Sequence, residues 1–146
     1  MAQTRKMKRV LTWVPVAITE DAVDFRKIDP LKWKLYDDEG VAYMATWIHA
    51  AEASDVTLTI PDVHGHRAVR GWLNGEPLPV LLGEGKRAAD LRQRIDSSRP
   101  MTLKKGWNEL LIRVDHIWGD SVIAVRLDAP ATTLWKLRTS NEQPGK

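Results

Sequence analysis

Two stretches of the sequence decide the fold, WLNGEPL at Trp72–Leu78 and LKKGWNELLIRV at Leu103–Val114. In the first, Asn74-Gly75 is the dipeptide that most strongly favours a two-residue β-hairpin, because both residues tolerate the positive φ angles of a type I′ turn. In the second, Gly106 permits a sharp turn, and Asn108 can hydrogen-bond the neighbouring backbone as an Asx-type cap. Both stretches therefore predict β-strands that are entered or left through tight turns.

Short runs of β-branched and aromatic residues surround these stretches, with turn residues between them. Asp55–Ile60 alternates cleanly between apolar and threonine positions, as a half-buried strand does. Val41–Ala50 has apolar groups at both parities, which predicts a central strand buried on both faces. The longest irregular stretch is Gly83–Pro100, in which Ala88–Ile95 has the composition of one or two helical turns. We expect strands at Arg9–Val16, Trp33–Tyr36, Val41–Ala50, Asp55–Ile60, Ala68–Leu73, Glu76–Leu82, Asn108–Val114, Ser121–Leu127 and Thr133–Leu137.

This pattern of many short strands and almost no amphipathic helix predicts an all-β sandwich or barrel. A chain of 146 residues, 43% hydrophobic and 28% charged, suits one soluble domain with a single core. We expect a basic tail at 1–8, one β-sandwich domain at 9–138 and a polar tail at 139–146.

The charge and the apolar runs argue against several classes of partner. The net charge is +3 and the pI near 9.3, but the basic residues in the tail and in Gly83–Pro100 are not interleaved with aromatics, so no nucleic-acid groove is expected. The apolar run Leu11–Ile18 is far shorter than the ~20 residues that span a bilayer, so no membrane partner is expected. Trp13 and Pro15 interrupt that run, which favours a first strand over a signal peptide. The absence of cysteine excludes disulfides and thiolate metal sites.

Five segments of the sequence form a recognisable pattern: Tyr43–Trp47, Val56–Ile60, Trp72–Leu78, Leu103–Val114 and Ile117–Leu127. Together they resemble the galactose-binding-like jelly-roll domains that accompany glycoside hydrolases and polysaccharide lyases. The resemblance implies an antiparallel jelly-roll β-sandwich of about eight or nine strands. It also implies one of three roles, namely a sugar binder, a calcium-stabilised module or a spacer against a catalytic domain, in an extracellular or periplasmic setting. No fixed binding motif of the family is matched, so no family binding residue is carried over.

Seven tryptophans accompany a single phenylalanine, and an indole offers a flat apolar face on which a sugar ring can stack. Four of them lie in or beside expected strands and are predicted to fill the core: Trp13, Trp47, Trp72 and Trp107. Trp118 lies in a short loop that does not need a large apolar group, and we take it, with its neighbours His116 and Asp120, as the main carbohydrate-binding candidate.

Three further aromatic residues are weaker candidates for the same role: Trp33, Tyr36 and Trp135. Arg92 and Arg94, within the long irregular stretch, could contact the carboxylates or sulfates of an acidic glycan. The alternative for these two arginines is a solvated insertion of mixed charge.

The sequence gives less support to a metal site or to a catalytic site. His64 and His66 are close in sequence, but a transition-metal site needs further ligands, and His49 and His116 are distant in the chain. The carboxylates of residues 37–39 could hold a structural calcium ion, although the loop lacks an EF-hand pattern and a polar turn explains it as well. No other cofactor is expected. No nucleophile elbow, zinc-protease, phosphate-loop or dinucleotide motif occurs, and a chain this small leaves little room for a cleft with two opposed carboxylates.

The sequence therefore supports a non-catalytic carbohydrate-binding or accessory module of a carbohydrate-active enzyme system. Its expected partners are a polysaccharide or glycan and an adjacent catalytic domain. The alternative is a structural or protein-interaction sandwich that packs against a catalytic domain without a small ligand. That alternative predicts an exposed apolar patch in place of a binding groove. A stand-alone enzyme is the least supported reading.

Overall fold

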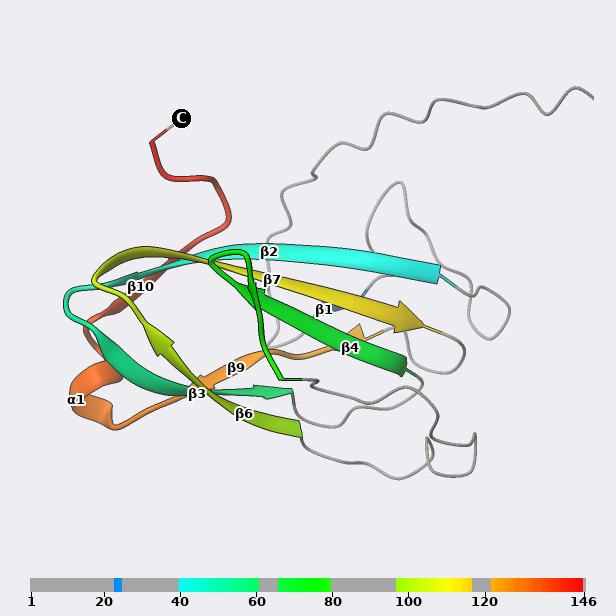
Figure 1. Cartoon of the computed structure of the whole chain (residues 1–146), viewed down its shortest axis with the longest axis horizontal. Coiled ribbons are helices and arrows are strands. Elements are labelled where there is room, and N and C mark those ends of the chain that lie inside the picture. The colour runs from blue at the N-terminus through cyan, green and yellow to red at the C-terminus, as the bar shows by residue number, and fades with distance from the viewer. Residues whose placement is uncertain (1–22, 25–39, 61–65, 80–96, 117–121, 146) are drawn as a thin grey trace, which may run out of the picture.

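A computed structural model gives the fold, and it describes residues 23–24, 40–60, 66–79, 97–116 and 122–145 (Figure 1). These residues form ten strands and one short helix. In chain order the elements are β1 (Val23–Asp24), β2 (Gly40–Ala50), β3 (Ser54–Ile60), β4 (His66–Leu73), β5 (Glu76–Pro77), β6 (Ser97–Leu103), β7 (Gly106–His116), β8 (Val122–Ile123), β9 (Arg126–Asp128), α1 (Ala131–Leu134) and β10 (Leu137–Ser140).

The strands form two layers, as the all-β sandwich expectation requires (Figure 1). One layer is a five-stranded sheet in the order β10-β2-β7-β4-β5, and the other is a three-stranded sheet in the order β6-β3-β9. The short strands β1 and β8 form a separate pair. Every pairing is antiparallel. The described part of the chain is therefore an antiparallel β-sandwich.

The two sheets are joined at one end by two short links, residues 51–53 and 104–105, and each of these carries the chain from one sheet to the other. In the five-stranded sheet, Ala50 at the end of β2 lies opposite both Gly106 of β7 and Leu137 of β10. The helix α1 lies at the same end (Figure 1). This end of the sandwich therefore gathers parts of the chain that are far apart in sequence.

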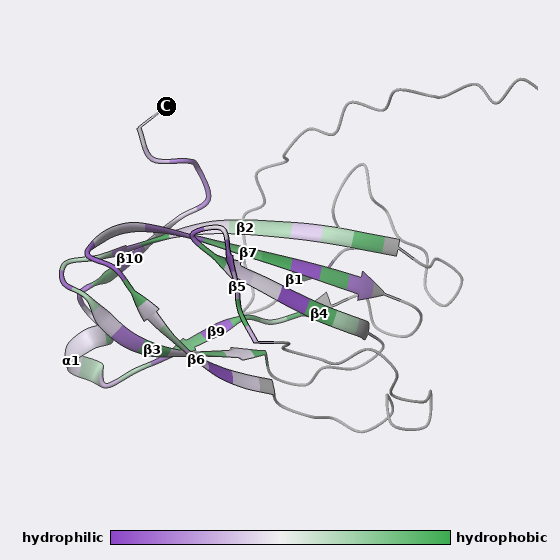
Figure 2. Cartoon of the chain, viewed as in Figure 1, coloured by the Kyte–Doolittle hydropathy of each residue, from purple (hydrophilic) through white to green (hydrophobic). Residues whose placement is uncertain are grey.

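One hydrophobic cluster fills the space between the sheets. Ile48 of β2, Leu58 of β3 and Val114 of β7 are fully buried in it, and burial of each such side chain stabilises the fold by roughly 1.5–3 kcal/mol. Hydrophobic and hydrophilic residues follow one another along β7 (Figure 2), so alternate side chains point into the core and away from it.

The hairpin at Asn74-Gly75 is confirmed. The φ angles of these residues are 54° and 85°, and Leu73 pairs with Glu76 across a two-residue turn. The return strand is shorter than the expected Glu76–Leu82, since β5 ends at Pro77. Pro77 and Pro79 have no N–H to donate to a ladder, and proline within a sheet is confined to such edge positions.

Two other strands differ from expectation. The strand β6, Ser97–Leu103, falls partly in the stretch that was expected to be irregular. It is an edge strand of the three-stranded sheet, where Pro100 is tolerated, and it buries Met101 and Leu103. The expected strand Ser121–Leu127 is two strands, because β8 pairs with β1 whereas β9 pairs with β3.

The end of the chain also differs. In place of a strand at Thr133–Leu137, the chain forms the helical turn α1 and then β10, which pairs with β2. The carbonyl of Pro130 accepts hydrogen bonds from the backbone N–H groups of Thr133 (2.8 Å) and Leu134 (3.0 Å). Because this helical turn occupies residues 131–134, the last strand begins only at Leu137.

The expectation that β2 is buried on both faces is wrong. Ala42, Ile48 and Ala50 are in the core, but Val41 and Tyr43 on the opposite face are 48% and 50% exposed. The apolar residues at both parities therefore reflect a core face and a solvent-facing apolar face. The expected strands Arg9–Val16 and Trp33–Tyr36 and the helical turns at Ala88–Ile95 lie outside the described residues.

Candidate functional site

Three of the four tryptophans expected in the core lie on the surface. Trp47, Trp72 and Trp107 are on the outer face of the five-stranded sheet, where Trp47 and Trp72 are half-buried and Trp107 is 40% exposed. Each is flanked along its strand by buried residues such as Ile48, Leu73 or Asn108, so the two-residue period of a strand turns the indole outward. Trp13 lies outside the described residues. Within the described part of the chain, these three tryptophans therefore lie on one outer face of the sandwich.

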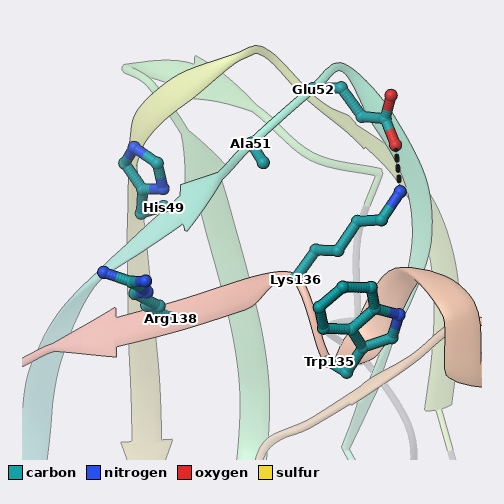
Figure 3. A pocket seen from close by; sticks show the side chains of 6 residues that line it. All are labelled: His49, Ala51, Glu52, Trp135, Lys136 and Arg138. Atoms are coloured by element: carbon teal, nitrogen blue, oxygen red, sulfur yellow. Dashed lines mark hydrogen bonds and ion pairs between the residues drawn. The ribbon is translucent and has the colours of Figure 1, made fainter.

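At the end of the sandwich where the sheets are joined, this face opens into a concavity of about 450 Å³ (Figure 3). Its most exposed aromatic group is Trp135, at 75%. An exposure this large is unusual for a side chain that buries more area than almost any other in a folded protein. The residues that line the concavity are His49, Ala51, Glu52, Trp135, Lys136 and Arg138.

Three segments supply these residues. His49 and Arg138 are cross-strand partners in β2 and β10. Glu52 lies in the link that leaves β2 for the other sheet. Trp135 is the C-cap of α1, and its N–H bonds the carbonyl of Ala131 at 3.3 Å. The register between β10 and β2, together with the turn of α1, therefore builds the site.

A salt bridge crosses the concavity. The Lys136 ammonium donates to Oε1 of Glu52 at 2.7 Å, and this hydrogen bond and the nearby positive charge lower the pKa of the Glu52 carboxyl. The same Nζ lies 5.8 Å from the centroid of the Trp135 ring, within the range of a cation–π interaction. The carboxylate, the ammonium and the indole thus form one contact series.

The aromatic surface continues from His49 to β7. His49 and Trp107 are cross-strand neighbours, and their rings meet edge to face, with centroids 5.1 Å apart and an interplanar angle of 71°. Arg138 lies on the other side of His49 in the same cross-strand row. The row Arg138–His49–Trp107 therefore places a guanidinium, an imidazole and an indole side by side across three strands.

This arrangement suits recognition of a polar ligand with flat apolar faces. Exposed indole supplies a stacking surface, while the guanidinium, ammonium, imidazole and carboxylate supply hydrogen-bond donors and an acceptor. Among the described residues, no group of three or more His, Asp or Glu side chains is arranged to hold a metal ion. Nor is any helix in the described ranges long and apolar enough to cross a membrane.

Of the carbohydrate-binding candidates expected from the sequence, Trp135 lines the concavity. His116 is the last residue of β7, opposite Gly40 and His66 in the register, and so lies at the far end of the strand from Gly106. The remaining candidates lie outside the described residues: Trp118, Asp120, Tyr36, Trp33, Arg92 and Arg94. The candidate calcium loop at 37–39 and His64 also lie there.

The sequence makes Trp135 only a weak candidate for carbohydrate binding, and it gives no sign that Glu52, Lys136 or Arg138 belongs to a site. The local signal that favours Trp135 is its place in a short segment after Pro130 that also contains two threonines, since a large apolar group in a surface turn has little to pack against. The other members depend on the pairing of β10 with β2, whose residues are far apart in the chain.

Comparisons with known proteins bear on the fold. No protein-family model matches the chain, and no curated protein matches it in sequence. Among solved structures, the chain is similar to a family 35 carbohydrate binding module from an environmental isolate, with a TM-score of 0.51 and 17% identity over 74% of this chain and 82% of that chain. This likeness confirms the expected fold: the protein has an antiparallel β-sandwich similar to that of this carbohydrate binding module.

Proposed function

We propose that the protein is a non-catalytic carbohydrate-binding module that holds its ligand in the concavity beside Trp135. The observation that carries the proposal is the 75% exposure of the Trp135 indole next to charged hydrogen-bonding groups. A sugar ring offers C–H groups to an aromatic face and hydroxyls to the groups around it, which is the combination that this concavity can satisfy. The likeness in fold to a carbohydrate binding module supports the same function.

A non-catalytic role also agrees with the roles of the carboxylates in the described residues. Asp115 is paired with Arg113, Asp128 with Arg126, and Glu52 with Lys136. Asp55 accepts a hydrogen bond from Thr102. These four acids each have a side-chain partner that gives them a structural role, whereas glycoside hydrolysis needs two carboxylates opposed across a cleft. We propose further that the module serves a carbohydrate-active enzyme, either as an adjacent domain or as a separate accessory chain.

Affinity electrophoresis in gels containing neutral or acidic polysaccharides tests this function. We expect retardation in at least one gel, and we expect Trp135→Ala to weaken binding by about tenfold, which corresponds to roughly 1.4 kcal/mol. Leu134→Ala is the matched control, because Leu134 is the preceding residue of α1 and is also exposed, at 39%. Migration that is unchanged by every polysaccharide would count against the proposal, as would equal loss in the two variants.

A second candidate function is docking of a protein partner on the outer face of the five-stranded sheet. The two outer faces differ: that of the three-stranded sheet carries polar side chains such as Thr57, Thr59 and Asp55, whereas that of the five-stranded sheet exposes Val41 and Tyr43. Contiguous exposed apolar surface is typical of an interaction site. The test is sedimentation of the chain with any catalytic domain encoded in the same reading frame. Under this reading, Tyr43→Arg abolishes co-sedimentation and Trp135→Ala does not.

A further inference from the structure

The Trp135 indole lacks the packing that normally fixes an aromatic side chain. It ends a helix of a single turn in which no residue is buried, and three quarters of its surface faces solvent. A platform that can change rotamer loses affinity, because ordering it on binding costs free energy. If the indole is to bind a ligand without this cost, some other contact must hold the ring in one rotamer.

The only described cation over the ring is Lys136, and the only described ion-pair partner of Lys136 is Glu52, which belongs to a distant part of the chain. The two side chains approach the concavity from the β2–β3 link and from the residue that precedes β10. Figure 3 shows the lysine side chain running past the indole towards the carboxylate. The ion pair therefore fixes where the ammonium stands relative to the ring.

We propose that Glu52 is a positioning residue for carbohydrate binding: it holds the Lys136 ammonium against one face of the Trp135 indole and leaves the opposite face for the sugar ring. The inference rests on the proposed function of the same site. It makes the platform one-sided, so a ligand stacks on a single face and is not clamped between two. The positive charge on the covered face also orients the ring, since a cation is attracted to the centre of an aromatic π-system.

The sign of the charges matters for this role. A carboxylate in the place of the ammonium would be repelled by the electron-rich face of the indole. Exchange of the two residues, Glu52→Lys with Lys136→Glu, would therefore rebuild the ion pair without rebuilding the contact with the ring. A pair that acts only as a staple between two segments would be restored by the exchange, whereas a pair that positions the indole would not.

Nuclear magnetic resonance tests the positioning without any ligand. The methylene protons of Lys136 are expected to be shifted upfield by the ring current of Trp135, and Trp135→Ala should abolish that shift. Glu52→Gln should remove at least half of it, because the amide has no charge with which to hold the ammonium. In Lys136→Arg, which keeps Glu52, the methylene protons of the arginine should still be shifted upfield. Equal shifts in the wild type and in Glu52→Gln would overturn the proposal.

Titration of the same variants with a soluble neutral β-glucan and with polygalacturonate tests the consequence for binding. Glu52→Gln should weaken binding by about two- to fivefold, as expected for one exposed cation–π contact of 0.5–1 kcal/mol, with the urea midpoint unchanged. Lys136→Arg, which keeps Glu52, should retain most of the wild-type affinity, whereas the exchanged pair should not. Arg126→Met, which breaks the exposed Arg126–Asp128 pair on the other sheet, is the matched control and should bind as the wild type does.

Acidification tests whether binding depends on the charge of Glu52. With the neutral β-glucan, the difference in affinity between the wild type and Glu52→Gln should shrink as the pH drops through the lowered pKa of Glu52. His49 and Arg138 are the other charged or titratable groups that line the concavity, and both are retained in each variant. If neither polysaccharide binds, the proposed function fails at this site and the ring-current shifts still decide the positioning. Loss of affinity in Glu52→Gln that is matched by Arg126→Met would overturn the positioning alone.

Discussion

The side-chain amide of Asn74 donates a hydrogen bond to Oδ1 of Asn108 at 3.0 Å, and this bond ties the β4–β5 hairpin to the start of β7. In return, Oδ1 of Asn74 accepts the backbone N–H of Glu109 at 3.0 Å. The two asparagines come from the two sequence stretches that define the fold. Their contact joins the tight turn of one stretch to the link between sheets that the other stretch forms.

Asn108 is fully buried, and every polar atom of its side chain has a partner. Its Nδ2 lies within hydrogen-bonding distance of the carbonyls of Lys104 (2.8 Å), Gly106 (3.0 Å) and Ile48 (3.3 Å), and its Oδ1 accepts the N–H of Lys104 at 2.9 Å. Asn108→Ala leaves several of these groups buried without partners, so we expect a loss of roughly 3 kcal/mol of stability. Urea unfolding measures it as a lower midpoint. Asn141→Ala, at an exposed position, should leave the midpoint unchanged, and a loss below about 1 kcal/mol for Asn108→Ala would show that the network is dispensable.

The turn residues separate two effects, backbone strain and side-chain hydrogen bonding. Gly75 has φ of 85°, and no atom lies within 4 Å of the Cβ that alanine would add. Gly75→Ala should therefore cost about 1–2 kcal/mol through strain alone. Asn74→Gly loses the side-chain hydrogen bonds of Asn74 but adopts the positive φ without strain. Asn74→Ala loses the same hydrogen bonds and is also strained at positive φ, so the alanine variant should be the less stable of the two. Thermal unfolding of the three variants gives the order, and equal stability of Asn74→Gly and Asn74→Ala would contradict the assignment of strain to this position.

The hairpin and the Asn108 cap could be predicted because they depend on residues that are close in sequence. Asn74-Gly75 selects its turn type through its own φ preferences, and Asn108 bonds the backbone of Lys104 and Gly106. The inward face of β3 could be predicted for the same reason, because Val56, Leu58 and Ile60 alternate with threonines along the strand. All three apolar side chains are buried.

The candidate site could not be predicted in the same way, because its members meet through pairings between distant strands. His49 meets Arg138 only because β10 pairs with β2, and it meets Trp107 only because β2 pairs with β7. The tryptophans were assigned to the core from their hydrophobicity. Which face each occupies is set by parity within a strand, and a two-sided apolar strand such as β2 gives no local signal for that parity.

The edge-to-face contact of His49 and Trp107 should be measurable as a coupling energy. Double-mutant cycles on such pairs give about 0.5–1.5 kcal/mol, and we expect the lower part of that range because Trp107 is 40% exposed. The cycle consists of His49→Ala, Trp107→Ala and the double variant, each assayed by urea unfolding. A second double-mutant cycle, on His49 of β2 and Trp135 at the end of α1, serves as the comparison. Additivity of the His49 and Trp107 effects within about 0.3 kcal/mol would mean that the rings do not interact.

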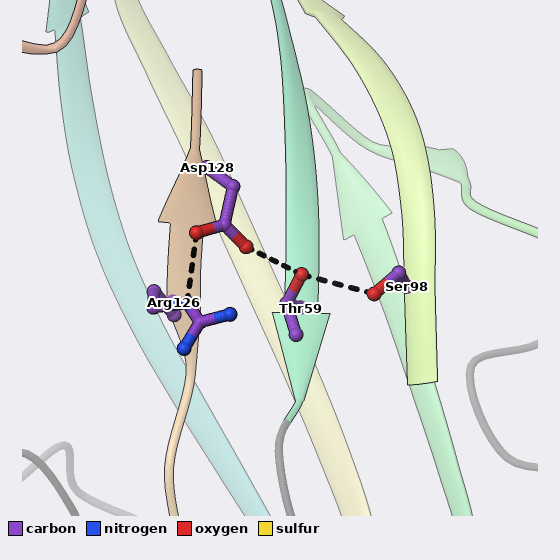
Figure 4. A network of polar contacts seen from close by, with 4 residues as sticks. All are labelled: Thr59, Ser98, Arg126 and Asp128. Carbon is purple, nitrogen blue, oxygen red and sulfur yellow. Dashed lines mark hydrogen bonds and ion pairs between the residues drawn. The ribbon is translucent and has the colours of Figure 1, made fainter. Parts of the chain in front are cut away.

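The last prediction concerns the acid stability conferred by Asp128 on the three-stranded sheet (Figure 4). Thr59 donates to Oδ2 of Asp128 at 2.7 Å, and Arg126 donates to Oδ1 at 2.8 Å. These hydrogen bonds, that of Thr59 first, lower the pKa of Asp128 below its ordinary value. Because the single hydroxyl proton of Thr59 is given to Asp128, the 3.0 Å contact between Thr59 and Ser98 has Ser98 as its donor.

A carboxyl whose pKa is lower in the folded state stabilises the fold above its unfolded pKa and loses that contribution as the pH falls through the folded pKa. Thr59→Val, which keeps the shape and removes the hydroxyl, should therefore be less stable than the wild type at neutral pH. The difference should shrink as the pH falls below about 4, where Asp128 is protonated in the unfolded chain. Ser98→Ala is the control, because it removes the donor to Thr59 and leaves the bond to Asp128. Urea midpoints from neutral pH down to about pH 2 give both curves. A Thr59→Val curve that runs parallel to the wild-type curve would mean that Thr59 does not act through the ionisation of Asp128.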